Sequence, residues 1–395
     1  MNKLFRYKYI VVFGKNAIHP LPKLQIFCTI LYLLTFNTAG YGAATQILND
    51  NFFPNPAELC LVKKEQLIGG NLVANPQFNF SGTATGGTGK ARSRVVDNLP
   101  YLLTAYRLSD KYVIGLNFTP SGYGHLDWPK NSVVSYNSTL THVLYYRGAG
   151  QLSYKINDSL SIGGGVNLEY NKLAELDFVI PGAGNQVNKV TGINYTTDFG
   201  LFYNINPKTS MSIVYYSPVN NKKGRGTSTL NEDVNPNLSL NFTEATLIYA
   251  GIRRVITEQW VLDGKVYWSD WTVQKNIYFI NSTTGSYNIP TDWKQTWSYQ
   301  LSTRFALNLR YAILGAILYE TNPAPLSTNA IGYPLSSIGS ASLGMDLNLV
   351  SNLSAQIMYG YGAFIPKSKI DSSSQGVGKI SGNFNVVALQ LTYRT

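Results

Sequence analysis

The sequence predicts an all-β chain that folds into a transmembrane antiparallel β-barrel of about 14 strands. Three observations predict this fold. Polar and apolar residues alternate along much of the chain, short polar turns recur at nearly constant spacing, and the one long apolar run lies near the N-terminus. The composition agrees, because 13% of the residues are charged and 13% are aromatic, whereas soluble domains carry about 25% charged residues.

The N-terminal segment 1–44 has the pattern of a secretory signal peptide. Five Lys and Arg residues precede an apolar run at 24–36, and small residues follow it up to Ala44. An apolar run of roughly 13 residues between such flanks is typical of a cleaved signal. We expect cleavage after Ala44, and an uncleaved N-terminal anchor is the alternative.

Cleavage would change both the charge and the cysteine content. Residues 1–44 hold five Lys and Arg and no acidic residue, so the net charge falls from +11 to about +6. Nucleic-acid binding then loses its main support. Cys60 is the one cysteine left, which excludes an internal disulfide and a multi-cysteine metal site. We expect no nucleic-acid partner, no metal and no cofactor.

Alternation with a period of two residues is clearest in segments 160–171, 259–268 and 297–305. In each segment large apolar side chains fall on one face and polar side chains on the other. Such a strand has an apolar medium on one side and a polar medium on the other. A soluble β-sandwich shows the same pattern, so alternation alone does not decide between the two folds.

The spacing of the turns favours the barrel. Short polar turns recur about every 50 residues, and longer loops rich in Gly, Asn, Ser, Thr or Pro lie between them. The turns are Ser109-Asp110, Asn157-Asp158, Asn206-Pro207-Lys208, Thr257-Glu258, Asn308 and Ser351-Asn352, and the loops include 121–139, 173–187, 219–241, 321–335 and 365–381. With both termini on the short-turn side, six turns and seven loops give 14 strands. An even number allows an antiparallel barrel to close without free edges.

The C-terminal segment 385–395 also fits a barrel strand. Val387, Leu389, Leu391 and Tyr393 share one face of it. An alternating apolar strand that ends near an aromatic residue resembles the C-terminal assembly signal of bacterial outer-membrane proteins. Thr395 stands where a terminal phenylalanine is usual.

Five short segments follow one another in an order and spacing found in a known family. They are NPA at 55–57, GLNFTPSGYG at 115–124, YYSPVNNKKGRG at 215–226, KVYWSDW at 265–271 and YETNPAPL at 319–326. They resemble segments of the FadL/TodX family of outer-membrane transporters for long-chain fatty acids and other hydrophobic compounds. The resemblance covers most of the mature chain.

The resemblance implies an N-terminal hatch at residues 45–65 inside a barrel formed by residues 66–395. The turn Asn55-Pro56-Ala57 would lie within this hatch. Pro56 forbids a ladder hydrogen bond and keeps Asn55 out of the helical region, so the turn is neither a regular strand nor a helix. A surface turn is the alternative interpretation.

The resemblance further implies uptake of a hydrophobic compound by passive diffusion, with sideways exit where the third barrel strand is distorted. That strand is expected at 111–120 and ends at Pro120, with Gly122 and Gly124 close by. Proline and glycine weaken a ladder and permit a bulge. An ordinary strand end that enters a loop is the alternative.

Alternation places three cationic residues on inward faces: Arg147, Lys265 and Arg304. Each is a candidate for contact with a fatty-acid carboxylate. Charged residues are common in barrel lumens, so a role as ordinary lumen residues is the alternative.

The remaining partner predictions concern the membrane. Lys222, Lys223 and Arg225 form a basic cluster in a long external loop, where they could meet phosphates of lipopolysaccharide. A solvated loop is the alternative. We expect the chain to reside in the bacterial outer membrane as a monomer, with a long-chain fatty acid or another hydrophobic small molecule as its ligand.

Two other functions compete with hydrophobic transport. In an outer-membrane lipase, a serine lies within hydrogen-bond reach of a histidine. The mature chain has His125 and His142, and neither begins the His-x-Ser-Asn-Gly sequence of outer-membrane phospholipases. We therefore expect no enzyme activity. A general porin for small polar solutes remains the alternative function, although no acidic constriction loop stands out.

Overall fold

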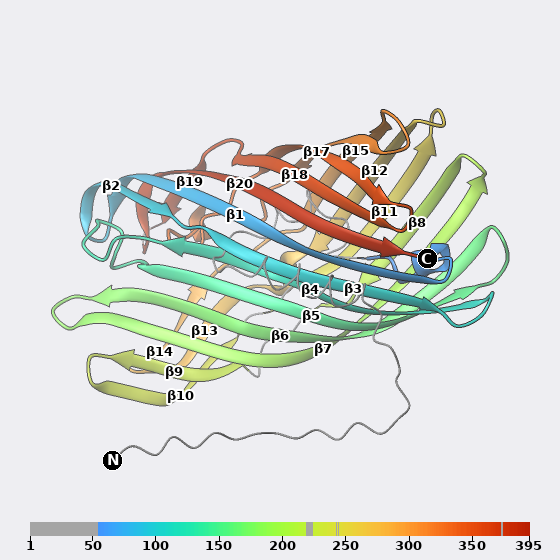
Figure 1. The fold of residues 1–395 in the computed structure, drawn as a ribbon. Helices are drawn as coiled ribbons and strands as arrows, with labels where there is room; N and C mark the ends of the chain where they lie inside the picture. The colour runs from blue at the N-terminus through green and yellow to red at the C-terminus, as the bar shows by residue number, and fades with distance from the viewer. Residues whose placement is uncertain (1–53, 219–223, 242, 244, 373) are drawn as a thin grey trace, which may run out of the picture. The chain divides into compact units, whose positions relative to one another are not determined.

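The structure is a computed structural model of the 395-residue chain (Figure 1). It describes residues 54–218, 224–241, 243, 245–372 and 374–395. The predicted signal peptide and residues 45–53 of the predicted hatch lie outside the described residues. Among the described residues, no helix has both the length and the apolar character needed to cross a membrane.

Fourteen strands form one closed antiparallel barrel, as the sequence predicts. Each pairs with the next along the chain, and β1 pairs with β20 from Gln66↔Arg394 to Thr83↔Val377, which closes the sheet (Figure 1). The barrel strands are β1 (Glu65–Ala84), β3 (Asp97–Arg107), β4 (Tyr112–Asp127), β5 (Leu140–Lys155), β6 (Leu160–Ile180), β7 (Gly184–Asn206), β8 (Thr209–Tyr216), β11 (Thr246–Val255), β12 (Trp260–Asp270), β15 (Thr296–Ala306), β16 (Tyr311–Glu320), β17 (Ile338–Val350), β18 (Leu353–Phe364) and β20 (Gly376–Arg394).

Shorter elements extend the long connections between barrel strands. These elements are β2 (Gly87–Arg94), β9 (Gly224–Leu230), β10 (Asp233–Asn241), β13 (Asn276–Ser282), β14 (Gly285–Pro290), β19 (Ser368–Ser372) and the 3-10 helices η3 (Trp271–Val273) and η4 (Leu326–Thr328). The remaining 3-10 helix, η2 (Pro56–Leu61), precedes β1. Apart from η2, these short elements therefore belong to the long loops, on the side of the barrel opposite the short turns.

All six short turns lie where the sequence predicts them. Asn157 and Asn308 show why these residues form turns, because each side-chain oxygen accepts a backbone N–H two residues further on. At the same end of the barrel, the Arg107 N–H donates to Lys64 O over 2.8 Å and the Thr395 N–H to Glu65 O over 3.1 Å. The start of β1 and the C-terminus therefore lie on the short-turn side, as predicted.

Four of the segments predicted as loops are instead partly strands. The described part of 219–241 holds β9 and β10, and segment 365–381 holds β19 and the start of β20. Segment 173–187 is mostly a continuation of β6 and β7, with a turn at 181–183. Strand β4 continues to Asp127 rather than ending at Pro120. Glycine and asparagine in these segments look like loop composition, but the turn itself needs only a few residues, such as Gly182 with its φ of +76°. The rest of each segment gains ladder hydrogen bonds as a two-stranded ribbon.

The two faces of each barrel strand show which medium they meet. On β6, Val166 is 65% exposed and points outward, whereas Ser161, Asn167 and Glu169 point inward and are at most 1% exposed. A soluble sandwich would bury its apolar face and expose its polar face. The reverse arrangement here is that of a barrel wall with lipid outside.

Candidate functional site

The described part of the N-terminal segment packs against the inner face of the wall. Asn55 caps helix η2, because its Oδ1 accepts from the Ala57 N–H over 2.9 Å. Pro56 occupies the first helical position, where its missing N–H costs no hydrogen bond. The Asn55 amide also donates to Leu201 O on β7 over 3.1 Å. The Asn-Pro-Ala sequence therefore caps and begins a 3-10 helix, and the expectation of a non-helical turn is wrong because proline is tolerated at the first helical position. The cap is bonded to the barrel.

Small residues of the wall make room for this segment. A Cβ at Gly200 would lie 2.0 Å from Asn55 Oδ1, and one at Gly163 would lie 2.4 Å from the carbonyl carbon of Pro56. Ser153 and Ser161 each donate a hydroxyl to Ala57 O over 3.1 Å. Sequence reasoning missed these contacts. The glycine run 163–165 inside an alternating strand was the feature that marked a close backbone approach.

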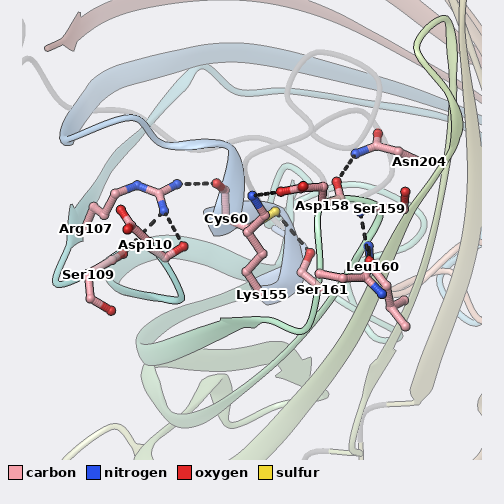
Figure 2. Close-up of polar contacts among 11 residues, drawn as sticks. Cys60, Arg107, Ser109, Asp110, Lys155, Asp158, Ser159, Leu160, Ser161 and Asn204 are labelled. Carbon is pink, nitrogen blue, oxygen red and sulfur yellow. Dashed lines mark hydrogen bonds and ion pairs between the residues drawn. The ribbon is translucent and has the colours of Figure 1, made fainter.

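Polar contacts join the end of η2 to the short-turn side of the barrel, as Figure 2 shows. Arg107 donates to Val62 O over 2.8 Å and also to Cys60 O, and it contacts the turn through Asp110 O over 3.1 Å. The Ser161 hydroxyl, which contacts Ala57 O, also lies 3.0 Å from Cys60 Sγ and shares its one proton between the two. Burial raises the pKa of the Cys60 thiol, despite the lowering effect of the Ser161 bond. The thiol is therefore held neutral in a fixed position.

Arg147, one of the candidate carboxylate contacts, lies in a buried polar network. It forms an ion pair with Glu169, whose Oε2 accepts from the Ser121 hydroxyl over 2.6 Å. The guanidinium carbon is 4.6 Å from the centre of the Tyr216 ring, and the Tyr216 hydroxyl donates to Pro54 O over 2.5 Å. The network thus extends from the wall to the N-terminal segment.

The other two candidate cations lie on different strands. The Lys265 ammonium on β12 is 5.7 Å from the centre of the Tyr249 ring. Arg304 on β15 forms a 3.0 Å ion pair with Asp346. The fold does not bring the three candidates into one site. Strands β12 and β15 are paired, but Lys265 is opposite Gln300, four residues from Arg304, and Arg147 lies on β5.

The wall changes where β3 and β4 separate. Their register ends at Leu102↔Phe118, whereas β4 remains paired with β5 to Asp127↔Leu140. The β4–β5 register skips Ser121, so the expected bulge lies between Pro120 and Gly122. Within the described residues, segment 119–127 therefore has no ladder partner on the β3 side.

Side chains occupy the space that the lost ladder leaves. Tyr123 and Leu144 of the β4–β5 hairpin belong to the same buried cluster as Leu72 and Leu99 of β1 and β3. Each of these four side chains is at most 7% exposed. Contact across this part of the wall is therefore made by side chains, which can be rearranged without breaking a backbone ladder.

An apolar cavity lies among the long connections. Its volume is about 40 Å³ and it opens to solvent, and Trp293 stacks on Tyr333 in its lining with ring centres 5.6 Å apart. Its apolar lining comes from three separate connections and comprises Leu176, Phe178, Ile277, Phe279, Ile289, Trp293 and Tyr333. Sequence reasoning missed this cavity, since no local pattern joins residues so far apart in the chain.

Comparison with known proteins identifies the family. The family model described as outer membrane protein transport protein (OMPP1/FadL/TodX) matches residues 35–394. The chain belongs to the FadL/TodX family. No curated protein matches the sequence significantly.

Solved structures share the fold of this FadL/TodX chain. A FadL homologue from Pseudomonas aeruginosa is 17% identical with a TM-score of 0.78, over 91% of this chain and 98% of its own. The toluene transporter TodX from P. putida is 14% identical with a TM-score of 0.70, over 91% and 96%. The monoaromatic hydrocarbon channel CymD is 16% identical with a TM-score of 0.62, over 91% and 99%.

Family membership settles the broad class of the protein. FadL/TodX proteins are outer-membrane transport proteins rather than enzymes, and the chain is therefore an outer-membrane transport protein for hydrophobic compounds. His125 and His142 accordingly need a role other than hydrolysis.

Proposed function

We propose that the protein takes up long-chain fatty acids or similar hydrophobic compounds by passive diffusion through a plugged barrel with a sideways exit. The external apolar cavity carries this proposal. A hydrocarbon tail gains about 0.8 kcal/mol for each methylene that leaves water, so apolar side chains such as Phe279, Trp293 and Tyr333 in this cavity would capture it. The printed descriptions of similar proteins, toluene transporter and monoaromatic hydrocarbon channel, support the same ligand class.

The lining of this cavity suits the apolar part of a ligand better than a carboxylate. Its lining residues include Asp177 but no Lys or Arg. Arg147, Lys265 and Arg304 lie on other parts of the wall, so a carboxylate could meet them only after it had left the cavity. Arg147 is the weakest of the three candidates, since Glu169 already neutralises it.

The N-terminal segment is the proposed plug. Residues 54–64 make polar contacts with the wall and pack against its glycines, as a plug in the lumen would. We propose that the hatch comprises residues 45–65 and the barrel residues 66–395. Removal of 1–44 as a signal peptide belongs to the same proposal.

The separation of β3 from β4 supports sideways exit. Pro120, Gly122 and Gly124 lie on the part of β4 that has no ladder partner on the β3 side. A ligand leaving there would displace side chains such as Tyr123 but would break no backbone ladder on the β3 side. Leaving this way would also keep the ligand out of the polar lumen below.

We also propose contact with lipopolysaccharide as a monomer. Lys222 and Lys223 of the predicted basic cluster lie outside the described residues. Another basic pair lies on the long-loop side, where Lys369 is directly opposite Lys379 across the β19–β20 ladder. Such like-charged pairs are unfavourable without an anion. The phosphates of lipopolysaccharide would supply one, and a closed barrel needs no second chain.

The transport proposal is tested with protein reconstituted in liposomes. We expect a fluorescent fatty acid or aromatic compound to bind and to enter the bilayer, and Trp293→Ala to weaken binding at least about tenfold. Trp297→Ala is the matched control, since Trp297 is 44% exposed on the outer face. Mass spectrometry of molecules that co-purify would name the ligand class. Rapid swelling of the liposomes in sugar solutions, with no binding of apolar compounds, would instead establish the porin alternative.

A further inference from the structure

Three side chains with metal-binding groups meet where β3 and β4 have separated. Asp97 is the first residue of β3, and His125 and His142 are direct partners across the β4–β5 ladder. One ligand atom from each residue lies within 4.8 Å of the other two. Asp97 is 7% exposed, so its carboxylate is largely shielded from water.

The three side chains are already in contact with one another. His125 Nδ1 is 2.9 Å from Asp97 Oδ2, and the Tyr123 hydroxyl donates to the same oxygen over 3.0 Å. The two imidazole rings stack in parallel with centres 4.0 Å apart. The Nε2 atom of His142 is buried and, within the described residues, has no hydrogen-bond partner. Burying a ring nitrogen without a hydrogen-bond partner costs free energy. This nitrogen is therefore available to bind a metal ion.

This ligand set suits a zinc-type ion. Two imidazoles and one carboxylate are ligands that Zn²⁺ uses, and three protein ligands leave a fourth position for water. Zinc binds such ligands at about 2.0–2.2 Å, which places tetrahedral ligands about 3.3–3.5 Å from one another. Side-chain rotations that bring the atoms closer than their present 4.8 Å limit and tilt the two stacked rings toward one point would place these three in range.

We propose that Asp97, His125 and His142 bind one divalent transition-metal ion, which ties β3 to the β4–β5 hairpin across the unpaired part of the wall. Asp97 is held on its other side by pairing with Ala74 of β1. The ion would thus replace the missing β3–β4 ladder with one strong cross-link. Ion binding is independent of the transport proposal, and its effect on ligand exit rests on that proposal.

The ion is sought first, with zinc alone and no ligand. Full-length mature protein without a histidine tag is stripped with EDTA in detergent and titrated with zinc by calorimetry. We expect one ion per chain, and we expect His142→Gln and Asp97→Asn each to weaken binding at least about tenfold. Asp127→Asn and Cys60→Ser are the controls. The first removes a carboxylate two residues from His125, and the second removes a thiol, which is a strong zinc ligand. Neither residue belongs to the proposed site, so zinc binding should be unchanged.

Stability provides a second measurement that does not depend on transport. Zinc should raise the temperature at which the wild-type barrel loses its compact gel mobility, and it should not do so for His142→Gln. The same mobility shift without zinc shows that each variant is folded. Wild-type protein that binds no zinc, or folded His142→Gln and Asp97→Asn variants that bind it as tightly as wild type, would overturn the site.

Ligand release is measured last. Zinc should slow the transfer of a fluorescent hydrophobic compound from the wild-type protein into the bilayer, with no effect on His142→Gln. If zinc binds but transfer is not slowed, the metal site stands and the proposed effect of the ion on ligand exit is refuted. Absence of transfer from either protein would instead count against the transport proposal.

Discussion

Glu169 shows how a single buried charge holds the polar wall together. Its carboxylate forms an ion pair with Arg147. It also accepts hydrogen bonds from the hydroxyls of Ser121 and Thr196, the latter over 3.3 Å. Glu169 is 0% exposed and Arg147 is 4% exposed, so neither charge is solvated by bulk water. The loss of one partner therefore leaves the other buried without this ion pair.

Glu169→Gln should destabilise the barrel by about 3–5 kcal/mol, because it leaves the Arg147 charge buried. Replacing both residues by methionine should cost less than Glu169→Gln alone. The comparison is Arg304→Met, whose side chain is 43% exposed and whose ion pair should contribute at most about 1 kcal/mol. Urea unfolding in detergent or liposomes measures all three. Equal losses of stability in Glu169→Gln and Arg304→Met would show that the buried ion pair contributes no more than the exposed one.

Asp177 provides a prediction about pH. It lies near the far end of β6, well beyond the roughly 9–11 residues of that strand that cross a bilayer. Burial, followed by the charge of Glu175, raises the pKa of Asp177 to about 7 from an ordinary value of 3.8. The folded state therefore keeps its proton between these values, while the unfolded state has lost it.

The stability of the barrel should then fall as pH rises from about 4 to 7 and level off above 7, because the unfolded state binds fewer protons. One pKa unit corresponds to about 1.4 kcal/mol, so Asp177 accounts for at most about 4 kcal/mol of this fall. Asp177→Asn should remove that part, which unfolding curves at several pH values would detect. A wild-type curve no steeper than that of the variant would refute the raised pKa.

At the scale of elements, the docking of the N-terminal segment depends on a glycine in β7. A methyl group at Gly200 would lie within 2.0 Å of Asn55 Oδ1, so the cap could not keep its bond to Leu201 O. The wall itself does not depend on this contact, since its ladder closes through β1 and β20.

Gly200→Ala should therefore open the lumen without unfolding the barrel. We expect higher single-channel conductance in planar bilayers, approaching that of a variant without residues 45–64, while resistance of the barrel to heat in detergent is retained. Pro56→Ala should act in the same direction but more weakly, since it only relaxes the turn. Gly150→Ala is the matched control, because the nearest atom to its new Cβ is 4.0 Å away. Unchanged conductance in the deletion variant would exclude a plug.

At the scale of the whole molecule, short turns and both ends of the barrel lie on one side, and long connections lie on the other. In an outer-membrane barrel the short-turn side is periplasmic. The Asp158 side chain is 99% exposed in one such turn, and its Lys155 bond, which is 2.7 Å long, lowers the pKa of its carboxyl group. Gln375 lies in the connection between β19 and β20.

In a Cys60→Ser background, cysteines placed at Asp158 and Glu258 should be shielded from impermeant thiol reagents added to intact cells. A cysteine at Gln375 should react, as should one at Lys223, which lies outside the described residues. Labelling of all four in permeabilised cells is the control for reactivity. Labelling at positions 158 and 258 but not at 223 and 375 would show that the short turns face outward and would contradict the predicted orientation.

The sequence by itself determined the strand number, the six turns and the medium on each side of the wall. Alternation and turn chemistry are local, so neighbouring residues such as Asn157 and Asp158 carry that information without the rest of the fold. The same locality explains the errors at 173–187 and at Pro120, where composition alone did not reveal pairing with a distant strand.

Only the tertiary structure decided which inward residues meet. Gly200 contacts Asn55, Arg147 is neutralised by Glu169, and Asp97 lies with His125 and His142 because strand register and the separation of β3 from β4 bring together residues far apart in sequence. The single cysteine excludes only a multi-cysteine metal site, and no local pattern in the sequence joins His125 and His142 to Asp97. Contacts of this kind depend on three-dimensional distances, which no local pattern contains.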